Sequence, residues 1–280
     1  MKKVISFSLW GKIRLYCIGA IKNALLAKKF FPEWTCRYYY DTSVPEKVVS
    51  YLESLDNTEL VFVKTPCGGK KFKDNQQFGA LWRFYCIEDD SIEVWMSRDT
   101  DSRLSQYERD TIDDFLESDI VLHTFKSKTE KQNLRAGMTS FKNNHRGRNT
   151  RKIRSTVAGP SPPTGLFGWK RGPRIRSVRE YNVGTIVRKA IDGIKRTHCP
   201  FYTDEYILNN KLFPYYRDQY YWTPRQWKDK QLDCVGEYVG QVVDEDDKPI
   251  NKYHERSFNN RCCYDDLDTL VEEYKKKYDL

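Results

Sequence analysis

The chain has 280 residues, a formal net charge of +9, and a composition that is 39% hydrophobic and 14% aromatic. This length can bury the core of one large domain or two small ones, and so many large rings exclude a disordered chain. No run approaches the roughly 20 apolar residues of a membrane span, and no secretory signal follows Met1, so we expect a soluble protein of the cytoplasm.

Strand-like and helix-like patterns alternate through the first 124 residues. They predict strands at residues 4–9, 35–41, 59–63, 92–96 and 119–124, with helices at 16–31, 43–55, 78–86 and 105–117 between them. Ser43 and Ser105 each stand three residues before a Glu, which is the capping-box spacing of a helix start. Strands and helices in this alternation predict an α/β fold with a parallel-cored sheet.

The pattern changes after residue 124. Residues 125–163 are rich in Lys, Arg, Asn, Ser, Gly and Pro and predict a long basic loop, mobile or ordered only by a ligand. Beyond it we expect helices at 176–196, 203–216 and 265–278 and a strand at 237–243. The chain therefore divides into an α/β half at 1–124, a basic loop at 125–163 and a less regular half at 164–280.

Positive charge is concentrated in one segment. Residues 142–196 hold fifteen Lys and Arg residues against two acidic ones, so the remainder of the chain is net acidic. Such a segment predicts an anionic partner: a diphosphate, an acidic glycan, nucleic acid or a membrane surface. Lys142–Arg154 has no regularly interleaved aromatic residues, and no known DNA- or RNA-binding motif is present. A nucleic-acid-binding or basic scaffolding protein acting through Lys142–Arg154 is the alternative function.

Asp99-Thr100-Asp101 follows the predicted strand at 92–96. Two carboxylates on a loop that leaves a strand can converge on one divalent cation, because hard cations such as Mg²⁺ and Mn²⁺ prefer oxygen ligands. Parallel α/β sheets place their ligands at the carboxyl ends of the strands, which is where this loop belongs. Two other Asp-x-Asp sequences begin at Asp244 and Asp266, and they have the pattern of a turn and of a solvated helix face.

Several blocks of the sequence occur in the same order in a known group of proteins. The chain resembles GT-A-type, DxD-containing glycosyltransferase-like proteins of large DNA viruses and some microbes, and Arg98–Ser105 (RDTDSRLS) is the most specific block. The other blocks cover most of the chain outside the basic loop: Phe7–Gly11, Tyr16–Asn23, Phe31–Trp34, Tyr40–Pro45, Phe78–Phe84, Gly165–Lys170, Tyr202–Pro214 and Val239–Pro249.

The resemblance implies a GT-A fold, with a Rossmann-type nucleotide-sugar-binding half and an acceptor-binding half that completes one domain. It implies a Mn²⁺ or Mg²⁺ ion held by Asp99 and Asp101, and Arg83 near a phosphate or anchoring that loop. The nucleoside would lie at the ends of the first two strands, against these residues: Ser8, Leu9, Trp10 and Asp41. Many enzymes of this fold complete the metal shell with a C-terminal histidine, for which His254 is the candidate, although a surface histidine is the alternative.

Further candidates come from the second half. Asp204 opens a predicted helix, where it is the candidate proton acceptor or acceptor-binding group, unless it and Glu205 only match the positive helix N-terminus. Gly165 could let the backbone approach the donor sugar, or form an ordinary turn. Lys170 could hold the diphosphate, or be a solvated cation.

The function expected is metal-dependent transfer of a sugar from a nucleotide-diphosphosugar, UDP-linked or similar, to a glycan or glycoprotein. A nucleotidyltransferase is a third hypothesis, since it would use the same paired carboxylates. The residues leave open the sugar, the acceptor, the linkage, the oligomeric state and whether the anomeric centre is retained or inverted. If the source is a virus, the host cytoplasm is the expected compartment.

Overall fold

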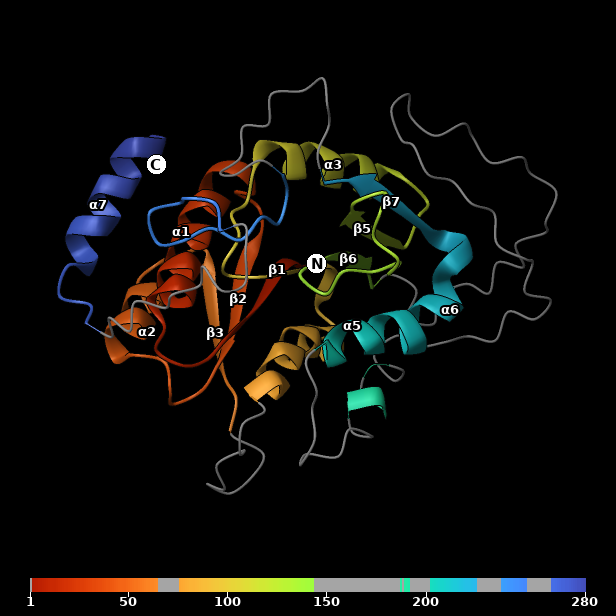
Figure 1. Ribbon diagram of the computed structural model, residues 1–280, viewed down its shortest axis with the longest axis horizontal. Helices are drawn as coiled ribbons and strands as arrows, with labels where there is room; N and C mark the ends of the chain where they lie inside the picture. Colours follow the sequence, from red (N-terminus) through yellow and green to blue (C-terminus); the bar gives the residue numbers. More distant parts are fainter. Residues whose placement is uncertain are drawn as a thin grey trace.

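The computed structural model describes residues 2–64, 76–143, 187, 189–191, 202–225, 238–250 and 263–280. Its centre is a seven-stranded sheet with the order β3-β2-β1-β4-β6-β5-β7 (Figure 1). The strands are β1 (Lys2–Leu9), β2 (Thr35–Tyr40), β3 (Thr58–Phe62), β4 (Ile92–Arg98), β5 (Leu122–Lys126), β6 (Met138–Lys142) and β7 (Tyr220–Pro224). Only β6 among them runs antiparallel to its neighbours, so the predicted α/β fold with a parallel-cored sheet is confirmed.

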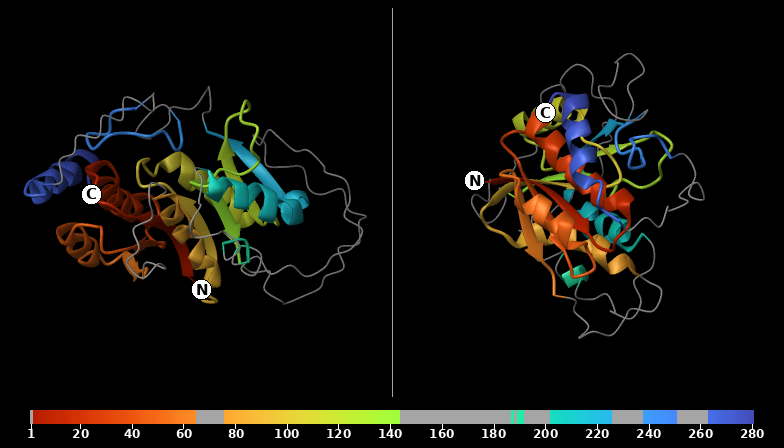
Figure 2. Two further views of the ribbon diagram at one scale, coloured as in Figure 1. Left: turned by 60° about the horizontal axis from the view of Figure 1, so that its bottom comes forward. Right: turned by 90° about the vertical axis from the view of Figure 1, so that its left-hand side faces the viewer.

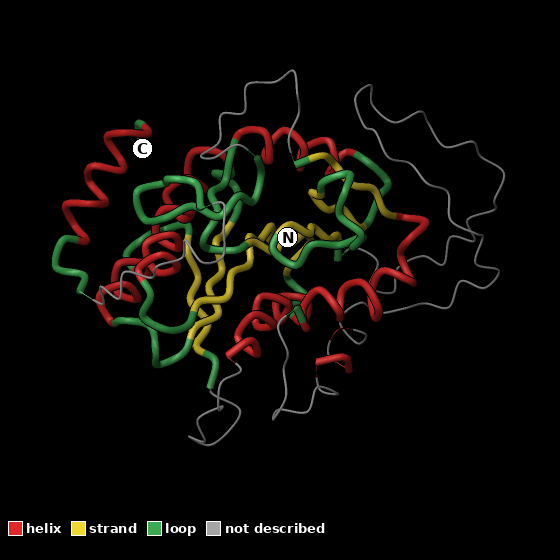
Figure 3. The backbone as a smooth tube through the Cα atoms, in the orientation of Figure 1, coloured by secondary structure: helices red, strands yellow, loops and turns green. Residues whose placement is uncertain are grey.

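Helices cover both faces of the sheet (Figure 2). One face carries α1 (Arg14–Phe30), α2 (Glu46–Glu53), α3 (Gln106–Glu117) and α7 (Leu267–Tyr278). The other carries the 3-10 helix η1 (Gln76–Glu88) and a continuous run made of α5 (Thr203–Ile207), the π-helical turn η2 (Leu208–Leu212) and α6 (Phe213–Tyr216), which leads through η3 (Arg217–Gln219) into β7. Figure 3 shows the strands between these two sets of helices.

The alternation of side chains along β4 explains why the sheet can be buried on both faces. Val94 and Met96 belong to the hydrophobic cluster under α1, whereas Trp95 points to the opposite cluster. There the Trp95 ring stacks on Phe141 of β6 at 6.0 Å between centroids and packs against Phe84 of η1 at 6.1 Å. A strand whose two faces are both apolar belongs in the middle of a layered α/β domain.

Three local expectations are wrong. Residues 125–163 are not loop throughout, since residues 125 and 126 end β5 and residues 138–142 form β6. The sequence of β6 is too short and polar to be recognised as a strand, and it becomes one because it pairs with β4 and β5. Residues 237–243 do not form a strand in their described part, which is a turn at Gly240 (φ 72°) followed by an isolated bridge between Val243 and Pro249. Ser43 does not cap α2, which begins after Pro45 without a side-chain cap.

The remaining expectations hold or lie partly outside the described residues. Ser105 caps α3 as predicted, accepting a hydrogen bond from the Glu108 amide at 3.3 Å. The helix expected at 176–196 is described only as helical residues at 187 and 189–191. The division at residues 124 and 163 stays a prediction, although β7 from the third segment pairs with β5 from the first. In the described part of the chain, no helix is long and apolar enough to cross a membrane.

Candidate active site at the carboxyl edge of the sheet

The sheet has a switch point between β1 and β4. The chain passes outward from β1 to β2 and β3 and then returns to form β4 on the other side of β1. Because β1 and β4 are parallel neighbours, the loops that follow Leu9 and Arg98 leave the same edge of the sheet. Open α/β sheets bind ligands in the crevice outside the carboxyl ends of the strands at such a point.

The loop that carries Asp99 and Asp101 is fastened to α1. A Cβ atom on Gly19 would lie 2.0 Å from the carbonyl oxygen of Thr100, so only glycine lets the loop approach the helix this closely. One turn later, the Asn23 side chain donates to the Ser102 carbonyl at 2.7 Å and accepts from the Leu104 amide at 3.1 Å. The two resemblance blocks at 16–23 and 98–105 are therefore the two sides of one contact.

The two carboxylates of this loop have different environments. The Asp99 side chain is 49% exposed, whereas Asp101 is buried. Asp99 lies against the backbone of the turn before β6, where a Cβ on Gly137 would meet its Oδ2 at 1.8 Å. On the other side, the Asp101 carbonyl accepts a hydrogen bond from the Val243 amide at 2.9 Å. Asp99 is therefore the more accessible carboxylate of the pair.

Arg83 joins Asp99 to Asp204. Its guanidinium, buried on η1, donates Nη1 to Asp99 Oδ1 and Nη2 to Asp204 Oδ2, the latter at 2.7 Å. Burial alone would lower the pKa of Arg83, but the charges of Asp99 and Asp204 raise it above its ordinary value. The Ser8 hydroxyl binds the backbone of this arginine, accepting a hydrogen bond from the Arg83 amide at 2.9 Å.

Arg83 therefore fits the anchoring role that was expected of it as one of two alternatives. It also connects the Asp-x-Asp loop to the predicted proton acceptor, which lies 121 positions after Arg83 in the sequence.

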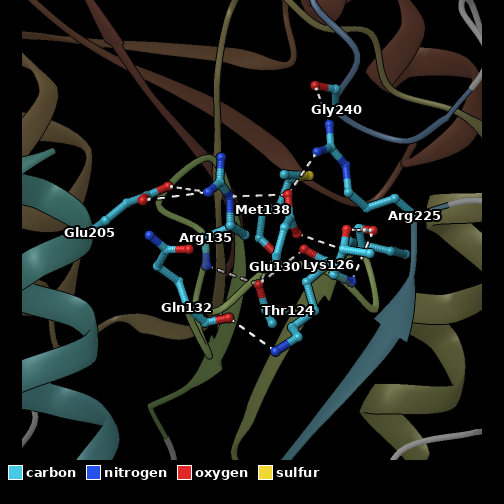
Figure 4. A network of polar contacts seen from close by, with 12 residues as sticks. Thr124, Lys126, Glu130, Gln132, Arg135, Met138, Glu205, Arg225 and Gly240 are labelled. Carbon is cyan, nitrogen blue, oxygen red and sulfur yellow. Dashed lines mark hydrogen bonds and ion pairs between the residues drawn. The ribbon is translucent and has the colours of Figure 1, made fainter.

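Glu205, next to Asp204, is a second buried carboxyl group of the site, besides Asp101. Figure 4 shows it projecting from α5 toward Arg135, whose Nη1 lies 3.2 Å from Glu205 Oε1. Burial raises the pKa of Glu205 to about 7; Arg135 lowers it, and the negative charges of Asp204, Asp99 and Glu130 add to the rise. A carboxyl group with such a pKa exchanges its proton near neutral pH, as acid–base catalysts do.

A chain of alternating charges supports Arg135. Glu130 Oε1 lies 3.8 Å from Arg135 Nε and 3.1 Å from Arg225 Nη1 (Figure 4). Arg225 in turn donates Nη2 to the Gly240 carbonyl at 3.0 Å. The turn between β5 and β6, the start of α5 and the segment after β7 are thereby tied together around the Asp99 loop.

The expected nucleoside side of the site lies at the ends of β1 and β2. The Trp10 indole packs on the backbone of η1, where a Cβ on Gly79 would meet it at 2.7 Å, and its ring is edge-on to Trp82 at 6.0 Å. The Asp41 carboxylate accepts from the Ser43 amide at 3.0 Å and from the Ser43 hydroxyl. The Ser43 hydroxyl oxygen accepts in turn from the Gly11 amide at 2.6 Å, so this serine joins the two strand ends.

The residues expected from the sequence differ in where the structure places them. It brings Asp99, Arg83 and Asp204 into contact and places the Ser8 hydroxyl against the Arg83 backbone amide. The Leu9 side chain is buried in the core under α1, so only its backbone can face a ligand. Three expected residues lie outside the described part of the chain: Gly165, Lys170 and His254.

Two contributors to this edge were not expected. Arg135 and Gly137 lie within residues 125–163, where the sequence pattern predicts a loop and nothing marks these two residues. Their importance comes from β6, which brings the preceding turn against Asp99 and α5.

A divalent cation at this edge would need some of its ligands from a substrate. In the described part of the chain, no three Asp, Glu, His or Cys side chains are grouped closely enough to hold a metal ion by themselves. Mg²⁺ is commonly bound by one or two carboxylates together with the phosphates of a substrate, without an all-protein cage. An exposed Asp99 beside a buried Asp101 fits a cation of that kind, which would arrive with a diphosphate.

Comparison with known proteins gives distant structural likenesses. No protein-family model matches the chain, and no curated protein matches it. The crystal structure of a glycosyltransferase involved in the glycosylation of the major capsid of PBCV-1 aligns with 80% of this chain and 82% of its own, at 10% identity and a TM-score of 0.43. The 4-diphosphocytidyl-2C-methyl-D-erythritolsynthase of Anaerococcus prevotii DSM 20548 aligns with 88% and 92%, at 11% identity and a TM-score of 0.45.

Proposed function

We propose that the protein is a metal-dependent glycosyltransferase that takes a UDP-linked or similar nucleotide-diphosphosugar as donor and a glycan or glycoprotein as acceptor. One observation carries the proposal. The exposed Asp99 stands at the switch point of an α/β sheet, on a loop fastened to α1, and Arg83 joins it to the Asp204 carboxylate of α5. An edge of this kind suits a substrate that has both a nucleoside and a diphosphate.

The donor would lie across the ends of β1, β2 and β4. Its nucleoside would contact the Trp10 ring and the Asp41 carboxylate, and its diphosphate would reach Asp99. Mn²⁺ or Mg²⁺, held by Asp99 and Asp101 together with the phosphates, would neutralise charge on the departing nucleoside diphosphate. The fastened loop would keep both carboxylates in place before the donor arrives, so little ordering is needed when it binds.

Glu205 is better suited than Asp204 to accept the proton of the acceptor hydroxyl. The Asp204 carboxylate already pairs with the Arg83 guanidinium at 2.7 Å, so one of its oxygens is occupied by a cation. Glu205 has a pKa of about 7, close to the pH at which a general base works best. In a direct displacement, the acceptor oxygen would bond to the anomeric carbon, the bond from that carbon to the diphosphate oxygen would break, and the hydroxyl proton would pass to Glu205. Asp204 would hold Arg83, and through it Asp99, in place.

The alternative of nucleic-acid binding through Lys142–Arg154 has less support in the part of this segment that is described. The Lys142 ammonium donates to the Ser118 carbonyl at 2.5 Å and to the Leu116 carbonyl at 3.2 Å, at the C-terminus of α3. It also lies over the Phe115 ring at 4.6 Å. A lysine used in this way stabilises the fold and is not available to a phosphate backbone.

A panel of nucleotide-sugars tests the proposal. We expect one donor to raise the melting temperature with Mn²⁺ but not with EDTA, and to be hydrolysed slowly to the nucleoside diphosphate. Asp99→Asn and Asp101→Asn should lose both effects. Asp246→Asn, in an exposed Asp-x-Asp sequence on another turn, is the matched control and should behave as the wild type.

Two results would overturn the proposal. One is a melting temperature that no donor raises, with or without metal. The other is full donor hydrolysis in Asp99→Asn. Tight, salt-sensitive binding of single-stranded DNA or RNA without a need for divalent metal would then favour the alternative function.

A further inference from the structure

A buried charge cluster lies behind the Asp99 loop, on the side away from Arg83. Asp247 Oδ1 lies 2.8 Å from Arg103 Nε and 3.1 Å from Lys22 Nζ. The exposed fractions of these side chains are 3% for Asp247, 0% for Arg103 and 5% for Lys22. One buried carboxylate therefore serves two buried cations, and neither cation is used by the proposed chemistry.

Arg103 extends this cluster to the loop. Its Nη1 donates to the carbonyl oxygens of Thr100 and Ser102, both at 3.1 Å, and its Nη2 donates to the Asp244 carbonyl at 3.1 Å. These two loop carbonyls are also the ones that Asn23 contacts. Because a guanidinium is planar and presents its donors in a fixed fork, the direction of Nε toward Asp247 sets the direction of the other donors.

The backbone at Asp247 is held in an unusual conformation. Its φ is 65°, in the left-handed region that costs free energy for residues other than glycine and persists only where the surroundings enforce it. The turn that encloses it is closed by Asp244, whose Oδ1 accepts from the amides of Asp246 at 2.9 Å and Lys248 at 2.8 Å. The Tyr278 hydroxyl of α7 donates to Asp247 Oδ2 at 3.4 Å.

We propose that Asp247, acting through Arg103, is a positioning residue for the Asp99–Asp101 loop. Asp247 fixes the guanidinium, and the guanidinium fixes the carbonyls on both sides of Asp101, while Val243 of the same segment holds the Asp101 carbonyl. The consequence for ligand affinity rests on the proposed function, but the effect on the loop itself does not.

Three variants separate positioning from a general loss of stability. Arg103→Lys keeps a cation beside Asp247 but removes the fork that reaches Thr100 and Ser102. Asp247→Asn removes the charge and keeps the backbone, because asparagine tolerates the left-handed conformation better than most residues. Lys22→Met is the control, since it removes the other buried cation from Asp247, together with its bond to the Glu245 carbonyl, and leaves the Arg103 contacts to the loop intact.

Hydrogen exchange reports on the loop without any ligand. The probes are the amides of Leu104 and Val243, which bond to Asn23 Oδ1 and to the Asp101 carbonyl. We expect exchange at both to be at least tenfold faster in Arg103→Lys and Asp247→Asn than in Lys22→Met, at temperatures equally far below each melting point. Equal exchange in all three variants would overturn the positioning role.

Binding of UDP in the presence of Mn²⁺, measured by calorimetry on the same proteins, tests the consequence. We expect the Kd to rise at least tenfold in Arg103→Lys and Asp247→Asn and less than threefold in Lys22→Met. If the wild type binds UDP and all three variants bind it equally well, the role of Asp247 in the site is refuted. If the wild type itself fails to bind, the proposed function fails, and hydrogen exchange still decides whether Asp247 positions the loop.

Discussion

Replacing Glu205 by glutamine should change how the stability of the protein depends on pH. Glu205 has a pKa of about 7 in the fold, against 4.5 for an unperturbed glutamate. The folded protein therefore binds more protons than the unfolded chain between these values, and this residue makes stability fall as the pH rises from about 4.5 to 7. At about 1.4 kcal/mol per pH unit, the loss amounts to about 3 kcal/mol. Glutamine resembles the protonated carboxyl group but does not titrate.

The assay is urea unfolding of the wild type and Glu205→Gln at pH 4.5 and at pH 8. We expect similar free energies of unfolding at pH 4.5 and a variant more stable by about 2–3 kcal/mol at pH 8, because the pKa of about 7 already includes the effect of Arg135. Glu53→Gln, the same charge change on an exposed part of α2, should follow the wild type at both pH values. A difference between Glu205→Gln and the wild type that is the same at both pH values would refute the reasoning. Turnover should be lost in Glu205→Gln at every pH despite its greater stability.

Three further outcomes follow from the contacts of the site and the core. Arg83→Met should lower the free energy of unfolding, measured in urea, by about 3 kcal/mol, because the mostly buried Asp204 loses its ion-pair partner. Asp99→Asn should lower it by less than about 1 kcal/mol, because Asp99 is half exposed. Gly137→Ala should lower donor hydrolysis about 100-fold with little change in melting temperature, because the added Cβ displaces the Asp99 carboxylate; unchanged hydrolysis would contradict the contact. Burial, and then the charge of Arg98, hold the pKa of His123 well below 6.5, so this residue lowers stability as the pH drops below about 6.5, opposite to the effect of Glu205. From pH 7 to pH 5, the free energy of unfolding should therefore change more favourably in His123→Phe than in the wild type, and an equal change would contradict the reasoning.

The proposed chemistry and the buried cluster behind it use the same loop from opposite sides. Arg83 holds the exposed Asp99 toward α5, while Arg103 holds the neighbouring carbonyls toward Asp247. Damage on either side should therefore reduce ligand binding. Damage at Arg103 or Asp247 should also speed hydrogen exchange at Leu104 and Val243 in the absence of ligand, whereas damage at Arg83 should act mainly on the Asp99 side chain. This difference separates residues that meet the substrate from those that position them.

The sequence by itself determined the local elements of the first 124 residues. The strands at β1 to β5, the helix α1 and the Ser105 cap of α3 depend on periodicity and on contacts a few residues apart, which a linear pattern preserves. The Asp-x-Asp loop could be located for the same reason, because it directly follows an apolar strand. The helical stretch at 203–216 and the closing helix α7 were also predictable from their spacing.

Only the tertiary structure decided how the site is assembled. Strand β6 exists because β4 and β5 supply its hydrogen bonds, and it carries the turn with Gly137 to Asp99. Arg83 meets Asp204 across 121 positions, a pairing that no local pattern encodes. The pKa of Glu205 depends on burial and on charges contributed by several distant segments. Burial, long-range ion pairing and strand insertion are properties of the packed chain, so the sequence identified the loop, and the fold selected its partners.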